Sequence, residues 1–279
     1  MSSKEEAQIQ ARAMHLVERY LMIEDVLGLP LNWDDPREAP YPVTLDLAEA
    51  DRGAHILREH WGLGLDPIPK LVELLENRGI KVLGIDAEKM DGLTARVKRR
   101  NAPALPVIVI NSKDWSERKR FTLAHELGHL VLDVAESLDS EKAASRFAGA
   151  FLMPAEAIWS EIGKHRTSIS LGELLRLKEI FGASLQAITY RCHDLGIISR
   201  ALFKELFDLF EARGWRKAPY EELGAVDPSA EDPTRLERLC FRALAEGAIS
   251  ESKAAELLDI SARELNRRLD QPELARPNG

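Results

Sequence analysis

The chain has 279 residues, of which 45% are hydrophobic and 30% charged, a composition typical of globular domains with a buried core. The first twenty residues lack the apolar stretch of a secretory signal, and no run approaches the ~18 apolar residues of a membrane span. Two cysteines, Cys192 and Cys240, are too few for a disulfide framework. We therefore expect a cytoplasmic protein with reduced thiols and no membrane partner.

The net charge of -8 argues against a chain that binds polyanions along its whole surface. The charge is uneven, however, because residues 93–120 hold eight basic and two acidic side chains. This stretch contains a basic run that could contact nucleic acid, although such runs are more often solvated hairpins. The candidate contacts are Arg96, Lys98, Arg99 and Arg100.

In chain order, hydrophobic spacing predicts helices over residues 4–27 and 46–60, the second with Asp46 as its N-cap. A third helix is expected at 67–78, beginning at Pro67. Three short β-rich segments follow and predict a small antiparallel sheet. They cover residues 80–85, 93–97 and 106–111.

Beyond the sheet the pattern is helical. Ser116 can cap a long helix that runs to about Asp133, and Asp139 or Ser140 can start the next helix. Residues 171–196 and 250–270 each have the form helix, short turn, helix. We therefore expect an α+β protein with four parts: an N-terminal helix and linker, a core, a helical subdomain, and a polar linker with C-terminal helices. Their bounds are 1–43, 44–165, 166–223 and 224–279.

The segment HELGH, residues 125–129, predicts a metal site on the long helix. Positions i and i+4 share a helix face, so His125 and His129 can direct two imidazoles at one ion. Zinc accepts imidazole nitrogen, and a catalytic zinc keeps one position open for water. Glu126 is rotated about 100° from His125 and can serve as a general base for that water without binding the metal.

A third ligand must come from a downstream carboxylate. Asp133 lies four residues after His129, but a third ligand on the same helix gives poor tetrahedral geometry. We therefore expect Asp133 either to contact one of the metal ligands or to be solvated. Glu141 lies on the first turn of the next helix and can reach the ion if that helix folds back. Position alone leaves the choice open.

The segments "VIVINSKDWSERKRFTLAHELGHLVLD" and "EKAASRFAGAFLMP" resemble, almost position for position, the ImmA/IrrE family of zinc metallopeptidases. The resemblance covers about residues 105–154. It implies a zincin-like core that holds one Zn²⁺ ion. It also implies that His125, His129 and Glu141 are the zinc ligands and that Glu126 is the catalytic acid/base.

The resemblance further implies a substrate. Members of this family are paired with helix-turn-helix repressors of the Xre type, so we expect an endopeptidase that cleaves such a repressor and releases stress, mobile-element or defence genes. Single-stranded DNA bound by the basic run is a candidate activator. Many relatives carry an N-terminal helix-turn-helix that this chain lacks, either because the repressor is a separate protein or because the sequence was trimmed.

Several alternatives stay open. The chain could be a non-catalytic regulator, braced by zinc, that binds DNA or a repressor through its helical modules. The strand at 106–111 could be a sheet edge that receives substrate or a buried core strand. His165, Tyr190 and Arg191 are candidates for stabilising an oxyanion. Either cysteine could be a core residue or an inhibitory zinc ligand, and the arginines of the last helix could serve duplex DNA or packing (Arg263, Arg267 and Arg268).

Overall fold

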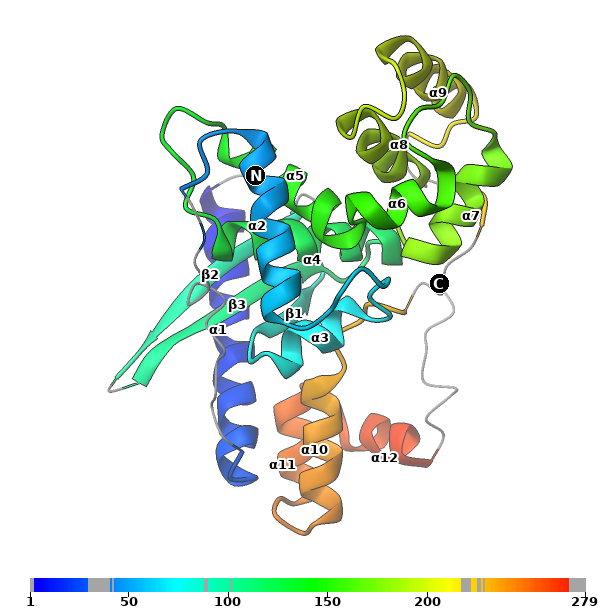
Figure 1. Ribbon diagram of the computed structural model, residues 1–279. Helices are drawn as coiled ribbons and strands as arrows, with labels where there is room; N and C mark the ends of the chain where they lie inside the picture. Colours follow the sequence, from blue (N-terminus) through cyan, green and yellow to red (C-terminus); the bar gives the residue numbers. More distant parts are fainter. Residues whose placement is uncertain are drawn as a thin grey trace.

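A small sheet lies in the middle of the molecule with helices on both faces (Figure 1). The computed structural model describes residues 3–29, 41, 43–87, 90–100, 102–216, 222–224, 227 and 229–270. The predicted α+β class is confirmed. Within the described residues, no helix is both long and apolar enough to cross a bilayer.

The sheet has the strand order β1-β3-β2 and is mixed rather than wholly antiparallel. Its strands are β1 (Lys81–Ile85), β2 (Gly92–Arg99) and β3 (Ala102–Asn111). β2 and β3 form an antiparallel hairpin, whereas β1 pairs in parallel with the other edge of β3. The most apolar strand, β3, takes the centre, where both faces and both edges are covered. Because the chain reverses direction between β1 and β2 and again between β2 and β3, β1 runs parallel to β3.

The two faces of the sheet support two hydrophobic cores. Val82, Ile108 and Ile110 face the larger core, and Leu83 and Val109 face the smaller one. On the larger side lie α2 (Leu47–His60), α3 (Leu71–Asn77), α4 (Ser116–Val131), α5 (Ser140–Leu152), α6 (Ala155–Ile162), α7 (Leu171–Phe181), α8 (Leu185–Asp194) and α9 (Arg200–Ala212). On the smaller side lie α1 (Ser3–Val26), α10 (Arg235–Ala245) and α11 (Glu251–Leu258). The last helix, α12 (Ala262–Asp270), packs on α10 and α11 through a separate small cluster around Leu265.

Two predicted helix starts are wrong. α3 begins at Leu71 instead of Pro67, because Pro69 restricts Ile68 to an extended conformation. Ser116 does not cap α4: Trp115 occupies the N-cap position without a side-chain hydrogen bond, and the Ser116 hydroxyl donates to the Asp227 carbonyl. The predicted Asp46 and Asp139 caps are confirmed, since each carboxylate accepts two backbone amides of its own helix.

The helix-turn-helix forms are confirmed at both predicted places. α7 and α8 are joined through Gly182, which has a left-handed backbone, and Ser184 caps α8. α11 and α12 are joined through Asp259, whose φ is 58°.

The polar linker predicted to precede the C-terminal helices is anchored to the core at Glu231. Glu231 is only 2% exposed and pairs with Arg120 of α4 at 2.6 Å. It also accepts the backbone amides of Leu71 and Val72 at the start of α3. The segment therefore joins α3 and α4 to the C-terminal helices by buried electrostatic contacts.

Candidate metal centre

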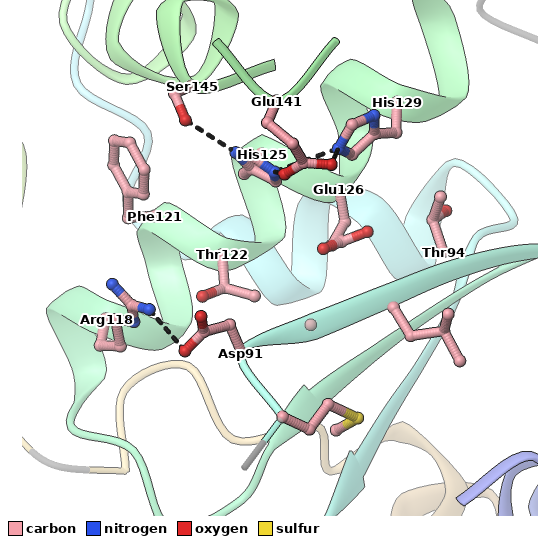
Figure 2. A pocket seen from close by; sticks show the side chains of 13 residues that line it. Asp91, Thr94, Arg118, Phe121, Thr122, His125, Glu126, His129, Glu141 and Ser145 are labelled. Atoms are coloured by element: carbon pink, nitrogen blue, oxygen red, sulfur yellow. Dashed lines mark hydrogen bonds and ion pairs between the residues drawn. The ribbon is translucent and has the colours of Figure 1, made fainter. Parts of the chain in front are cut away.

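Three predicted ligands meet in one place (Figure 2). The Nε2 atoms of His125 and His129 on α4 lie 3.1 Å apart. Glu141 of α5 reaches across, with Oε2 at 3.1 Å from His125 Nε2 and Oε1 at 3.3 Å from His129 Nε2. All three ligand atoms lie within 4.8 Å of one another. Within the described residues, His125, His129 and Glu141 form the one group of side chains that could hold a metal ion.

The donor set fits a tetrahedral cation. Two ligand atoms at 2.0–2.1 Å from such an ion lie about 3.3 Å from each other, close to the separations observed here. Two imidazoles and one carboxylate fill three positions and leave the fourth open, the arrangement typical of a hydrolytic zinc site. Burial, with His129 beside it, lowers the pKa of His125, which favours the neutral imidazole that binds metals.

Local packing explains why Glu141 lies close to the two histidines. Asp139 accepts the amides of Glu141 and Lys142 and so fixes the first turn of α5. At Gly128 the two helices come close, because a Cβ there would lie 3.2 Å from the Cα of Ala144. Gly128 therefore admits the backbone of α5 close to the site.

Ser145 is a site residue that the sequence analysis missed. Its Oγ lies 3.2 Å from Nδ1 of His125, the ring nitrogen on the side away from Glu141 (Figure 2). Such a contact orients the imidazole and fixes which nitrogen faces the ion. The signal was available, because Ser145 lies four residues after Glu141 and therefore on the same face of α5.

Glu126 lies in the same cavity as the three ligands but outside their set, and it is directed toward β2 (Figure 2). Gly92, the first residue of β2, makes room for it: a Cβ on Gly92 would lie 2.6 Å from Glu126 Oε1. Burial, and then the charges of Glu141 and Asp91, raise the pKa of Glu126 to about 7. A bound cation opposes this shift, because positive charge favours the carboxylate.

The cavity over the site has a volume of about 720 Å³. Its floor is the HELGH face of α4, and its walls are the start of β2 and the first turns of α5. Arg118 pairs with Asp91 at 2.6 Å along this wall (Figure 2). Edge strand β2, and not the buried central strand β3, borders the site, which corrects the placement of residues 106–111 as a substrate-binding edge.

Other predicted site residues lie elsewhere. Asp133 follows the end of α4 at Val131, so the helical spacing from His129 does not extend to it, and it is exposed and does not line the cavity. His165, Tyr190 and Arg191 do not line the metal cavity either. Cys192 and Cys240 are fully buried core residues, as one of the two interpretations held, and burial raises the pKa of both thiols.

The basic run is divided between two environments. Arg96 donates to the carbonyl of Leu130 at 2.7 Å and so ties β2 to the last turn of the metal-site helix. Arg99 donates to the carbonyl of Pro103, whereas Lys98 and Arg100 are exposed at the end of the β2–β3 hairpin. The hairpin projects from the body of the molecule (Figure 1). Any nucleic-acid contact there stays a prediction.

The arginines of the last helix are largely engaged. Arg267 and Arg268 pair with Glu264 at 2.8 and 2.9 Å, and Arg268 also pairs with Glu237 at 2.6 Å. These contacts use the guanidinium donors that a recognition helix would direct at bases. The packing interpretation of α12 is therefore favoured over direct duplex binding.

Comparison with known proteins identifies the domain that contains this site. Residues 75–193 match the family model of the IrrE N-terminal-like domain, peptidase M78. The matched segment includes β1 to β3, the HELGH helix and Glu141, and it ends within α8. A search of curated proteins finds no match. The family match confirms the resemblance to ImmA/IrrE proteins and supports a metallopeptidase-type function.

Proposed function

We propose that the chain is a zinc-dependent endopeptidase that cleaves a helix-turn-helix repressor of the Xre type, because residues 75–193 match the M78 domain of ImmA/IrrE proteins. Cleavage releases genes for stress responses, mobile elements or defence. The observation that carries the proposal is Glu126, a buried carboxylate placed beside a three-ligand site without being one of its ligands. A purely structural zinc site has four protein ligands and no use for such a base.

Each residue of the site has a separate role in the proposed hydrolysis. His125, His129 and Glu141 would hold Zn²⁺, which when bound polarises the scissile carbonyl and makes water more acidic. Glu126 accepts a proton from the attacking water and later delivers it to the leaving amine.

The orientation of the substrate follows from β2. Its outer edge borders the metal cavity at Gly92, Leu93 and Thr94, and its inner edge pairs with β3. An extended peptide can add to such an edge by main-chain hydrogen bonds, which places its carbonyls along the HELGH helix. The main chain of the substrate is then bound as an additional strand, and pockets beside it can select its side chains.

The hairpin offers a route for activation by single-stranded DNA. Lys98 and Arg100 are exposed at its end, and Arg96 links its β2 strand to Leu130, the residue after His129. DNA held by the exposed cations would act on a strand that contacts both the substrate edge and the last turn of α4. Such binding should weaken steeply with salt, because it rests on phosphate contacts.

The test is a cleavage assay on a gel. Zinc-loaded protein is incubated with the repressor encoded beside it, with and without single-stranded DNA, and Glu126→Gln serves as control. We expect one discrete product, reduced about 10²–10⁴-fold in rate by the substitution, with zinc retained. His125→Ala should lose the metal as well as the product.

The same assay separates the enzyme from a non-catalytic regulator. If the repressor stays intact in every lane while Glu126→Gln and wild type bind it equally well, the endopeptidase proposal fails. If the product forms at the same rate with and without DNA, the endopeptidase proposal is supported and the proposed role of the hairpin in activation is refuted.

A further inference from the structure

A second cavity, which we name the side lobe, opens from the metal cavity. It has a volume of about 1060 Å³ and lies between the start of α4, α5 and α8. The two cavities share the wall residues Met90, Asp91, Arg118, Phe121, Glu141 and Ser145. A peptide bound at the metal site can therefore place a side chain in the side lobe.

Aromatic side chains line the side lobe. Trp115 and Phe121 are half-buried there, and Tyr190 of α8 is 53% exposed. Tyr190 is held by Phe203 and Phe207, with ring centroids at 5.0 and 5.1 Å. Ring faces of this kind accept apolar stems and cations alike.

Most charges in the side lobe are already paired. Arg118 pairs with Asp91, and Lys142 with Asp139 at 3.5 Å. The deeper ion pairs join Arg146 and Arg191 to Asp51 and Asp194, and Glu117 to Lys178. An anionic ligand would have to compete with these carboxylates for each cation.

Asp114 is the exception. Within the part of the chain that the structure describes, its carboxylate makes no hydrogen bond or ion pair, and it does not cap α4. Asn111 fixes the loop, since its carbonyl accepts the Asp114 amide at 3.3 Å and its side chain accepts the Lys113 amide at 3.1 Å. Burial raises the pKa of Asp114, although Arg118 opposes the shift. A half-buried carboxylate without an ion-pair partner is stabilised further by an incoming cation.

We infer that the side lobe binds a lysine or arginine side chain of the substrate, with Asp114 as counter-charge and the three aromatic rings along the apolar stem. The inference rests on the proposed endopeptidase function and names its substrate preference. Long cationic side chains suit a lobe that has aromatic walls and one carboxylate without an ion-pair partner. DNA-binding proteins display such side chains in number, which agrees with a repressor as substrate.

The test uses fluorogenic peptides in which each position around the cleaved bond carries lysine, norleucine or glutamate. Wild type should prefer lysine over norleucine at one position by about 10- to 100-fold in kcat/KM, the worth of a hydrogen bond to a charged group. Asp114→Asn should lose that preference and still cleave the norleucine peptide. Asp114→Lys should shift the preference to glutamate. Asp133→Asn, which changes an exposed acid outside both cavities, should behave as wild type.

Binding provides an independent readout. Fluorescence anisotropy with the same peptides on Glu126→Gln protein, with and without Asp114→Asn, should show the same ratios in Kd. If Asp114→Asn cleaves peptides with an unchanged preference for lysine, the side-lobe inference is wrong and the endopeptidase proposal still holds. Lysine-selective binding that depends on Asp114, with no cleavage of any peptide or repressor by wild type, keeps the side lobe and refutes the peptidase.

Discussion

Gly92 and Glu126 occupy complementary space across the strand–helix interface: a Cβ on Gly92 would lie 2.6 Å from Oε1 and 3.0 Å from Cγ of Glu126. It would also lie 2.6 Å from the methyl group of Thr122. Gly92 is therefore a positioning residue for the base, and the strand that borders the substrate also sets where the proton acceptor lies.

Gly92→Ala should displace the Glu126 carboxylate while leaving the three metal ligands in place. Because a shift of about 1 Å in a catalytic group costs about 10²-fold in rate, we expect kcat/KM to fall by about that factor with zinc content unchanged. Metal analysis tests whether the zinc content is unchanged, and a peptide cleavage assay measures kcat/KM. Gly172→Ala is the matched control, since a Cβ there has only the Ser170 hydroxyl nearby, at 3.9 Å. Full activity in Gly92→Ala would show that the base tolerates the displacement.

Ser145→Ala should weaken metal binding without removing a ligand. The hydroxyl contacts Nδ1 of His125 and orients the ring, and the loss of such a contact typically costs about 10- to 100-fold in metal affinity. Competition with a zinc chelator measures the change. Ser145→Thr, which retains the hydroxyl, should recover most of the affinity. Equal affinities in the alanine and wild-type proteins would contradict an orienting role.

Local patterns identified the part of the site that lies on one helix. The spacing of His125, Glu126 and His129 is set by helix geometry, so the sequence alone predicts their common face. Glu141 is sixteen residues from His125; helix geometry argued against Asp133, but only the family resemblance assigned Glu141 as the third ligand. The end of α4 at Val131 excludes Asp133 from the helical face, and no local signal marks that end clearly.

Features that depend on packing between distant segments were not predictable from the pattern. The local sequence predicts only a turn before a strand at Gly92. Its contact in space, Glu126, lies thirty-four residues further along the chain. The polarity of residues 224–235 indicates a solvated linker, yet Glu231 is buried against α3 and α4. Strand order was also missed, since three short apolar segments do not reveal which one is central.

Glu231→Gln tests that buried contact. The change leaves Arg120, itself buried, without its carboxylate, and breaking a buried ion pair in this way costs about 3–5 kcal/mol. Chemical denaturation should show a corresponding loss in the free energy of unfolding. Glu246→Gln removes an exposed partner of Arg242 and should cost at most about 1 kcal/mol. If the two variants are equally stable, the linker is not held by its charge.

Glu76 predicts a pH dependence of stability that is separate from catalysis. It is buried between α1 and α3, where Tyr20 donates to Oε1 at 3.1 Å and Oε2 has no hydrogen bond. Burial raises its pKa from 4.5 to about 7, an effect that Tyr20, Arg235, Arg238 and Lys81 only partly oppose. A carboxyl whose pKa is higher in the folded chain favours folding while protonated. Its contribution is complete below pH 4.5 and is lost as the pH rises through about 7.

Glu76→Gln keeps a neutral group at this position and should remove that dependence. Between pH 5 and pH 8, the free energy of unfolding of wild type should fall relative to Glu76→Gln by up to about 3 kcal/mol. Urea denaturation at several pH values measures the difference. Glu73→Gln on the same helix changes an exposed carboxylate, so its free energy of unfolding should change with pH as that of wild type does. The same pH dependence in wild type and Glu76→Gln would mean that Lys81, Arg235 and Arg238 keep Glu76 ionised throughout this range.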